Sequence, residues 1–212
     1  FDIDDNLFEL TPDNPAYGGY EDEVLDRLAI MLKLADVVTC STEDLAEQLT
    51  VRFPGRRIEV VENALDDYAF RSLGSMPKGG PRRFITWRGG ASHISDLLWY
   101  TPAFHQFDQA ADPKWGVQFM GFNPSWLTDP PPWMIQPAHP TPRYYYTPYV
   151  PDVYRFGRLF RENVAPWAHV VPLKDTLFNR AKSAISAIEA IYAGALPIVP
   201  GFREWEIPGA LR

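Results

Sequence analysis

The chain has 212 residues, of which 27 are Asp or Glu and 20 are Lys or Arg, so its formal net charge is −7 at neutral pH. Because proteins bind nucleic acid largely through cationic side chains, this balance argues against non-specific nucleic-acid binding, though not against a local basic patch. Hydrophobic residues make up 46% of the chain, enough for a packed core. No apolar run in the sequence reaches the roughly 18 residues that a membrane-spanning helix needs.

The single cysteine, Cys40, excludes an internal disulfide and a structural cysteine–zinc site. It favours a reducing compartment, so we expect a cytoplasmic protein. The chain opens at Phe1 without a methionine and stops at Arg212 within what reads as unfinished structure. These ends predict a fragment, or a protein seen in part. The length of 212 residues allows one large domain or two small ones.

Alternating strands and helices are predicted in the first 65 residues. Residues 1–6 indicate the end of a strand, residues 10–19 a loop, and residues 21–34 a helix with apolar side chains on one face. Residues 36–40 indicate a short buried strand, and residues 58–61 indicate another strand. The helix between them is capped by Ser41 or Thr42, whose side-chain oxygen can accept a hydrogen bond from a free amide of the first turn.

A similar alternation is predicted after a polar, glycine-containing stretch at residues 66–80, which we interpret as a hinge between two lobes. Strands are expected at residues 83–87, 115–120, 168–171 and 196–199, and helices at 93–109 (kinked near Pro102), 153–163 and 179–193. The insert at residues 123–151 holds nine of the 21 prolines and several aromatic residues, which disfavours a long internal strand. The alternation implies parallel sheets covered on both faces.

Ligands of parallel α/β sheets bind at the carboxyl ends of strands, and two segments fit such a place. In the first, a strand runs into Arg88, Gly89 and Gly90 before a helix that starts near His93. Glycines let a ligand approach the backbone closely, and Arg88 and His93 could contact an anion. The segment lacks the phosphate-binding spacings of known glycine-rich loops, so an ordinary strand-to-helix turn is the alternative interpretation.

The second segment holds Asn179, Lys182, Ser183 and Glu189 in the helix expected at residues 179–193. An ammonium and a hydroxyl beside a helix N-terminus suit a diphosphate. Glu189 follows Lys182 by seven residues, about two turns, so the two would share a helix face and Glu189 could accept from ribose hydroxyls. The alternative is a solvated lysine and a surface or paired glutamate, because burying a bare carboxylate is costly.

The sequence from Pro172 to Ser183, followed by Glu189, Gly194 and Pro197-Ile198-Val199, resembles that of the donor-binding lobe of GT-B glycosyltransferases. It is similar above all to family 4 (group 1) enzymes, which are often found in bacteria and phages. Four further segments, at residues 1–6, 35–42, 60–66 and 87–97, resemble the same family in the expected order.

The resemblance implies two Rossmann-like lobes with a cleft between them. Residues 1–65 would be the C-terminal part of an incomplete first, acceptor-side lobe, residues 66–80 the hinge, and residues 81–212 the second, donor-binding lobe. The implied activity is a hexosyltransferase that moves a sugar from a UDP- or GDP-linked donor to an acceptor hydroxyl, with retention of configuration and with no cofactor or required metal. The acceptor stays open between a glycan, a lipid, a protein and a modified nucleic-acid base.

The resemblance also implies roles for single residues. Lys182 and Ser183 would hold the diphosphate, with Arg88, Gly89, Gly90 and Asn179 beside it, and Glu189 the ribose. Lys182 and His93 are the candidate catalytic groups. The family pattern often has two glutamates, and Ala181 stands at the position of the first.

Two alternatives remain. The alanine at position 181 favours a catalytically inactive glycosyltransferase-like module for binding or assembly. Asp2, Asp4 and Asp5 at the start of the chain, Asp2 and Asp4 above all, would suit Mg²⁺ in a phosphatase or a metal-dependent sugar transferase. We expect a strand end with capping or solvated aspartates there instead.

Overall fold

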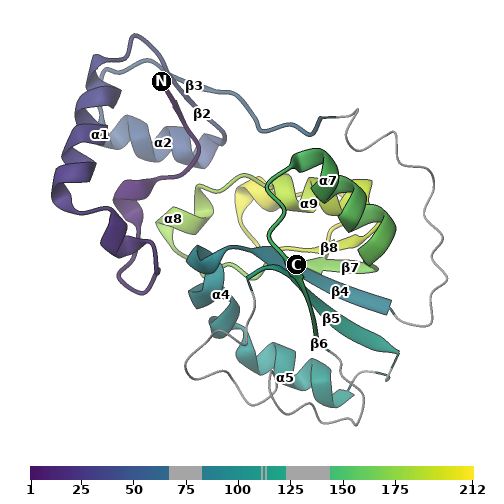
Figure 1. Cartoon of the computed structure of the whole chain (residues 1–212). Coiled ribbons are helices and arrows are strands. Elements are labelled where there is room, and N and C mark those ends of the chain that lie inside the picture. Colours follow the sequence, from purple (N-terminus) through teal and green to yellow (C-terminus); the bar gives the residue numbers. More distant parts are fainter. Residues whose placement is uncertain (67–82, 111, 113, 123–143) are drawn as a thin grey trace.

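The computed structural model describes residues 1–66, 83–110, 112, 114–122 and 144–212, without the side chains of Asp108, Glu162 and Asn163. We call residues 1–66 the first lobe and the described residues from 83 onward the second lobe. Each lobe has its own parallel sheet, which confirms the predicted α/β, Rossmann-like architecture (Figure 1). The predicted hinge from residue 67 on, and the insert from 123 to 143, lie outside the described residues.

The first lobe is a small three-stranded sheet with two helices. Its parallel strands β1 (Asp2–Ile3), β2 (Val38–Cys40) and β3 (Ile58–Val60) lie side by side in chain order. Helix α1 (Asp22–Leu34) precedes β2, and helix α2 (Glu43–Arg52) connects β2 to β3. Short 3-10 turns lie at Leu7–Glu9 and Tyr17–Gly19. The elements share one buried apolar cluster, which includes Ile3, Leu32, Val38, Leu45 and Leu49.

The second lobe contains a five-stranded sheet. Its elements are β4 (Arg83–Gly89), the 3-10 turn Ala91–His93, α4 (Ile94–Trp99), α5 (Thr101–Ala110), β5 (Trp115–Gly121), β6 (Tyr144–Pro148), α7 (Val153–Arg158), the π-helical segment Leu159–Val164, β7 (Ala168–Val170), α8 (Leu177–Arg180), α9 (Ile185–Tyr192), β8 (Leu196–Ile198) and the 3-10 turn Arg203–Trp205. Helices α4 and α5 lie on one side of the sheet, and α7 and α9 on the other (Figure 1).

The strand order β6-β5-β4-β7-β8 is the doubly wound order, since the first strand of this lobe is central and the next strands extend outward in both directions. All four neighbouring pairs are parallel. The order reverses between β4 and β7. Ligands of doubly wound sheets bind at this reversal, so the topology alone directs attention to the carboxyl ends of these two strands.

Most predicted elements are present, but the single helix expected at residues 179–193 is wrong. Helix α8 ends at Arg180, and α9 begins at Ile185. The helix expected at residues 93–109 is interrupted at Tyr100, as the proline at position 102 predicted. Strand β6 was not anticipated; it is a short edge strand that ends at Pro148, a place where the sheet tolerates proline.

The two lobes contact each other through α2 and the segment around α8. Thr42, the residue that caps α2 by accepting from the Leu45 amide at 3.1 Å, also donates to the Ala181 carbonyl at 2.8 Å. Gln48 donates to the Leu177 carbonyl at 3.1 Å. The side chain of Ala181 is fully buried and belongs to the apolar cluster of the first lobe. No helix within the described ranges is long and apolar enough to cross a membrane.

Candidate ligand site between the two lobes

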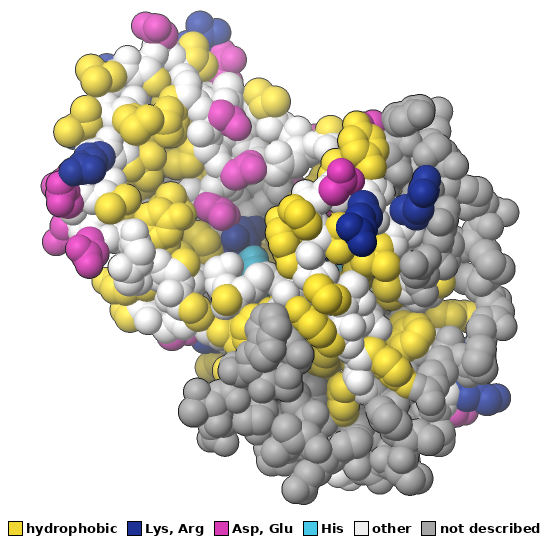
Figure 2. All heavy atoms as spheres, in the orientation of Figure 1, with side chains coloured by type: hydrophobic (Ala, Val, Ile, Leu, Met, Phe, Trp, Pro, Cys, Tyr) yellow, Lys and Arg dark blue, Asp and Glu magenta, His cyan; other side chains and the backbone are white. Residues whose placement is uncertain are grey.

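A cavity of about 300 Å³ lies between the lobes at the reversal point of the second sheet. Six of the predicted site residues line it: Arg88, Gly89, Gly90, His93, Lys182 and Ser183. The other lining residues come from both lobes: Asp4, Asp5, Asn63, Trp87, 171–173, Ile185, Ser186 and Trp205. Figure 2 shows acidic side chains of the first lobe above a hollow that contains a histidine and basic side chains. The segments singled out from the sequence therefore meet at one place.

The glycines at the end of β4 allow close packing of the site. A side chain at Gly89 would place its Cβ 2.7 Å from the Trp87 ring, which is itself buried. Gly121 ends β5 with a φ of +99°, and a Cβ there would lie 2.6 Å from the Gly89 carbonyl oxygen. Gly90 differs, since nothing lies within 4 Å of the position of its Cβ. Its backbone is thus open to a ligand.

Arg88 and Glu189 form a partly buried ion pair beside these glycines, with 2.6 Å between Nη2 and Oε2. The contact is not an aligned hydrogen bond, because Glu189 Oε2 and Arg88 Nε lack hydrogen-bond partners among the described residues. Burial raises the pKa of the Glu189 carboxyl, and the charge of Arg88 opposes that rise. The Glu189 carboxylate is thus held beside the Arg88 guanidinium by charge rather than by an aligned hydrogen bond.

Glu189 lines a second cavity of about 230 Å³, which shares Arg88, Gly89 and Gly90 with the first. Tyr149 and Phe156 also line this second cavity. Because the expected helix is split, Lys182 and Glu189 do not share the face of one helix, and they contact different cavities. The prediction of a shared face is wrong.

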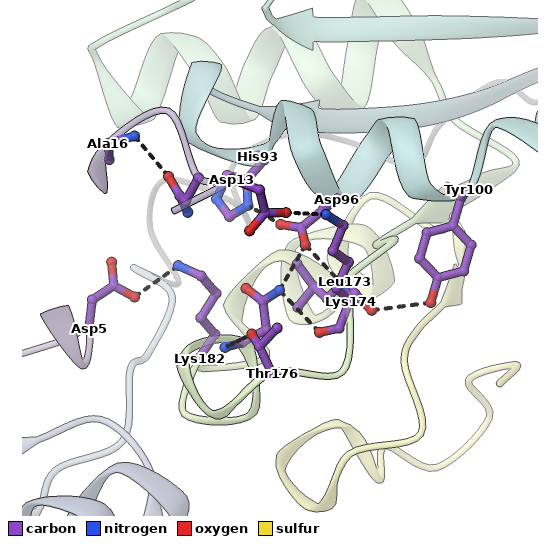
Figure 3. A network of polar contacts seen from close by, with 12 residues as sticks. Asp5, Asp13, Ala16, His93, Asp96, Tyr100, Leu173, Lys174, Thr176 and Lys182 are labelled. Carbon is purple, nitrogen blue, oxygen red and sulfur yellow. Dashed lines mark hydrogen bonds and ion pairs between the residues drawn. The ribbon is translucent and has the colours of Figure 1, made fainter. Parts of the chain in front are cut away.

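Lys182 and Ser183 lie in the break before α9, rather than in the first turns of a helix as expected. Lys182 Nζ lies 2.8 Å from Asp5 Oδ1 (Figure 3). Ser183 Oγ accepts a hydrogen bond from Asn63 Nδ2 at 2.9 Å. Both groups therefore face the first lobe across the cavity, and both are engaged there.

His93 is oriented by a buried network behind the cavity (Figure 3). Its Nδ1 lies 3.4 Å from Asp96 Oδ2. Asp96 Oδ1 accepts from Asn179 Nδ2 at 2.8 Å and from the Lys174 amide at 3.0 Å. Asn179, a predicted donor-binding residue, is buried and lines neither cavity. Its contacts position Asp96, and through Asp96 the His93 ring.

The position of Ala181 has a structural explanation. Its side chain is fully buried within the first-lobe cluster, and a glutamate would place a carboxylate among Ile3, Cys40 and Leu45. The alanine at this position is thus explained by packing between the lobes.

Sequence reasoning did not place Asp5, Asn63 or Trp205 in the site. Asp5 and Lys182 are 177 positions apart, so no local spacing could connect them. Asp2, the partner of Asp4 in the magnesium alternative, instead accepts a hydrogen bond from Thr39 Oγ1 at 2.5 Å. Within the described part of the chain, no three His, Cys, Asp or Glu side chains are grouped so that they could hold a metal ion.

No model of a known protein family matches the chain, and no curated protein sequence matches it significantly. The arrangement can hold an elongated anionic ligand, with cations and a hydroxyl in the first cavity and a carboxylate acceptor with aromatic rings in the second.

Proposed function

We propose that the protein is a GT-B-type glycosyltransferase that transfers a sugar from a nucleoside-diphosphate sugar to an acceptor hydroxyl. One observation carries the proposal. The cavity at the reversal point of the doubly wound sheet brings together Arg88, Gly89, Gly90, His93, Lys182 and Ser183, which come from two distant segments of the sequence. Doubly wound sheets bind nucleotides at this point, which supports a nucleotide donor.

The two cavities, which share Arg88, Gly89 and Gly90, suit the parts of such a donor. The diphosphate would lie beside Lys182 and Ser183, within reach of the Arg88 guanidinium and the open backbone of Gly90. The ribose would donate hydroxyl hydrogens to the Glu189 carboxylate, which lines the second cavity beside Arg88. The base would lie in the second cavity, near Tyr149 and Phe156.

Catalysis would consist of positioning the donor and stabilising the charge that develops on the departing diphosphate. Lys182 supplies a cation for that charge. The His93 ring, held by Asp96, lines the same cavity and presents a polar ring nitrogen to the donor. Because Lys182 supplies positive charge for the departing diphosphate, the proposed mechanism does not require a metal ion. Retention of configuration is what the family resemblance implies.

The proposal is tested by product analysis. The chain is incubated with a panel of UDP- and GDP-linked sugars. Mass spectrometry measures the released nucleoside diphosphate together with the second product, which is free sugar when water is the acceptor and the elongated glycan when a glycan is added. Turnover of at least one donor that persists in EDTA supports the proposal. Turnover that EDTA abolishes favours the metal-dependent alternative, whereas calorimetric binding without turnover favours the inactive binding module.

A further inference from the structure

The cavity between the lobes has walls of opposite charge. The second lobe contributes the cations Arg88 and Lys182, and the first lobe contributes the carboxylates Asp4 and Asp5. A ligand that fits both walls needs an anionic part on one side and a neutral or cationic, hydrogen-bond-donating part on the other.

Lys182 and Ser183, which are proposed to bind the diphosphate, are already paired with side chains of the first lobe. The Lys182 side chain is 15% exposed and pairs with Asp5, which is 42% exposed. The Asn63 amide bridges Ser183 Oγ at 2.9 Å and Asp4 Oδ1 at 3.2 Å. A phosphate that reaches Lys182 therefore competes with the Asp5 carboxylate for the same ammonium group.

When a phosphate replaces Asp5 on the Lys182 ammonium, the Asp5 carboxylate loses its counter-ion. It then lies at the edge of the bound diphosphate. A free carboxylate accepts hydrogen bonds from hydroxyl groups and repels a second anion. The group attached to the diphosphate would lie next to it, between the two lobes.

An independent feature of the same cavity also favours a ligand with hydrogen-bond-accepting oxygens, which sugar hydroxyls and phosphates both supply. Trp205 lines the cavity and is only 2% exposed, yet its indole Nε1 has no hydrogen-bond partner within the described ranges. A buried donor without an acceptor is costly, and a sugar hydroxyl is an acceptor of the kind that this N–H lacks.

We propose that Asp4 and Asp5 select a neutral, hydroxyl-rich sugar as the transferred group. The donor diphosphate replaces Asp5 on Lys182, and the freed Asp5 and its neighbour Asp4 accept hydrogen bonds from the sugar hydroxyls. Sugars that carry a carboxylate are rejected by the same two side chains. The inference rests on the proposed function, because it assigns the substrate class of that site.

Calorimetry on the full chain tests it with donors that differ at one group: UDP-glucose against UDP-glucuronate, and GDP-mannose against GDP-mannuronate, with UDP and GDP alone as references. We expect the wild type to bind the neutral sugar at least about tenfold more tightly than the acidic one. In Asp5→Asn this preference shrinks severalfold. The free nucleoside diphosphate binds the variant more tightly, because the competing carboxylate is gone.

Asp13→Asn is the matched control. Asp13 also pairs across the lobes with a lysine, Lys174, but lies outside the cavity. It should keep the wild-type preference. An Asp5→Asn protein with the wild-type preference and the wild-type affinity for UDP or GDP overturns the inference and leaves the proposed function standing. A wild type that binds none of these nucleotides overturns the proposed function, and the inference with it.

Discussion

Lys182 is the residue on which the proposed diphosphate site most depends, because its ammonium points into the space between the lobes and its present partner is an exchangeable carboxylate. A hydrogen bond to a charged group contributes about 1.5–3 kcal/mol. We therefore expect Lys182→Ala to raise the Kd for a nucleoside diphosphate about 10- to 100-fold, measured by isothermal calorimetry.

Lys174→Ala is the matched control for that measurement. Lys174 is likewise a lysine of the second lobe that is paired with a first-lobe aspartate, but it does not line the cavity. Its loss should leave the Kd unchanged. Equal weakening in both variants would mean that the lysines act through contact between the lobes rather than through the ligand.

Substitution of Gly90 tests the approach of the ligand without a change in the stability of the fold. Its φ is −85° and its Cβ position is open, so Gly90→Ala should fold with unchanged thermal stability. The methyl group would occupy space that we assign to the diphosphate, so nucleotide affinity should fall about tenfold or more. A variant that binds as tightly as the wild type would show that the ligand does not approach this backbone.

At the scale of elements, α2 is the helix whose cap also joins the lobes. Thr42→Ala removes the bond from the Leu45 amide and leaves the Ala181 carbonyl without its donor. We expect a loss of about 2–4 kcal/mol in the free energy of unfolding, measured by chemical denaturation. Thr42→Ser keeps the hydroxyl and should cost far less.

Thr176→Ala provides a comparison, because Thr176 caps α8 through the Asn179 amide at 3.1 Å. Its loss should cost about 1 kcal/mol. If Thr42→Ala cost no more than Thr176→Ala, the contact from Thr42 to Ala181 would contribute nothing beyond an ordinary cap.

Strand β7 carries a histidine that gives the fold a pH dependence. His169 is buried against Thr86, with 2.9 Å between Nδ1 and Oγ1. Burial, and then the charge of Arg88, lower the pKa of His169 from 6.5 to about 3. The unfolded chain binds a proton near pH 6.5 and the folded chain does not, so stability is retained above that pH and falls as the pH decreases toward 3.

The slope for one such proton is about 1.4 kcal/mol per pH unit. Denaturation of the wild type and of His169→Gln between pH 5 and 7.5 measures it by difference. The stability advantage of the wild type should shrink as the pH falls through this range. A difference that does not vary with pH would show that His169 does not resist protonation in the fold.

The elements also show how far sequence patterns reach. The helix of residues 21–34 and a cap at Ser41 or Thr42 follow from local periodicity and chemistry; the helix is confirmed, and the cap is Thr42. The helix break at residues 181–184 was not predicted, because Ala181, Ala184 and Ala187 are all buried and keep a helical spacing across it. Apolar spacing reports which residues are buried, and it does not report a local change of backbone direction.

At the scale of the whole molecule, the site depends on contact between residues far apart in the chain. Second-lobe candidates such as Arg88, His93 and Lys182 were recognisable from strand-end positions, and the sheet topology explains why they converge. The first-lobe residues Asp5 and Asn63 were not recognisable as partners of this site. Their role follows from how the lobes pack, which no local pattern in the sequence encodes.

The most direct test of the central claim is a crystal structure of the full chain with a nucleoside-diphosphate sugar that it binds. We predict that the diphosphate lies within hydrogen-bonding distance of Lys182 Nζ and Ser183 Oγ, that a ribose hydroxyl contacts Glu189, and that Asp5 has left Lys182. A ligand bound elsewhere, with the pair of Asp5 and Lys182 intact at its present 2.8 Å, would contradict the account.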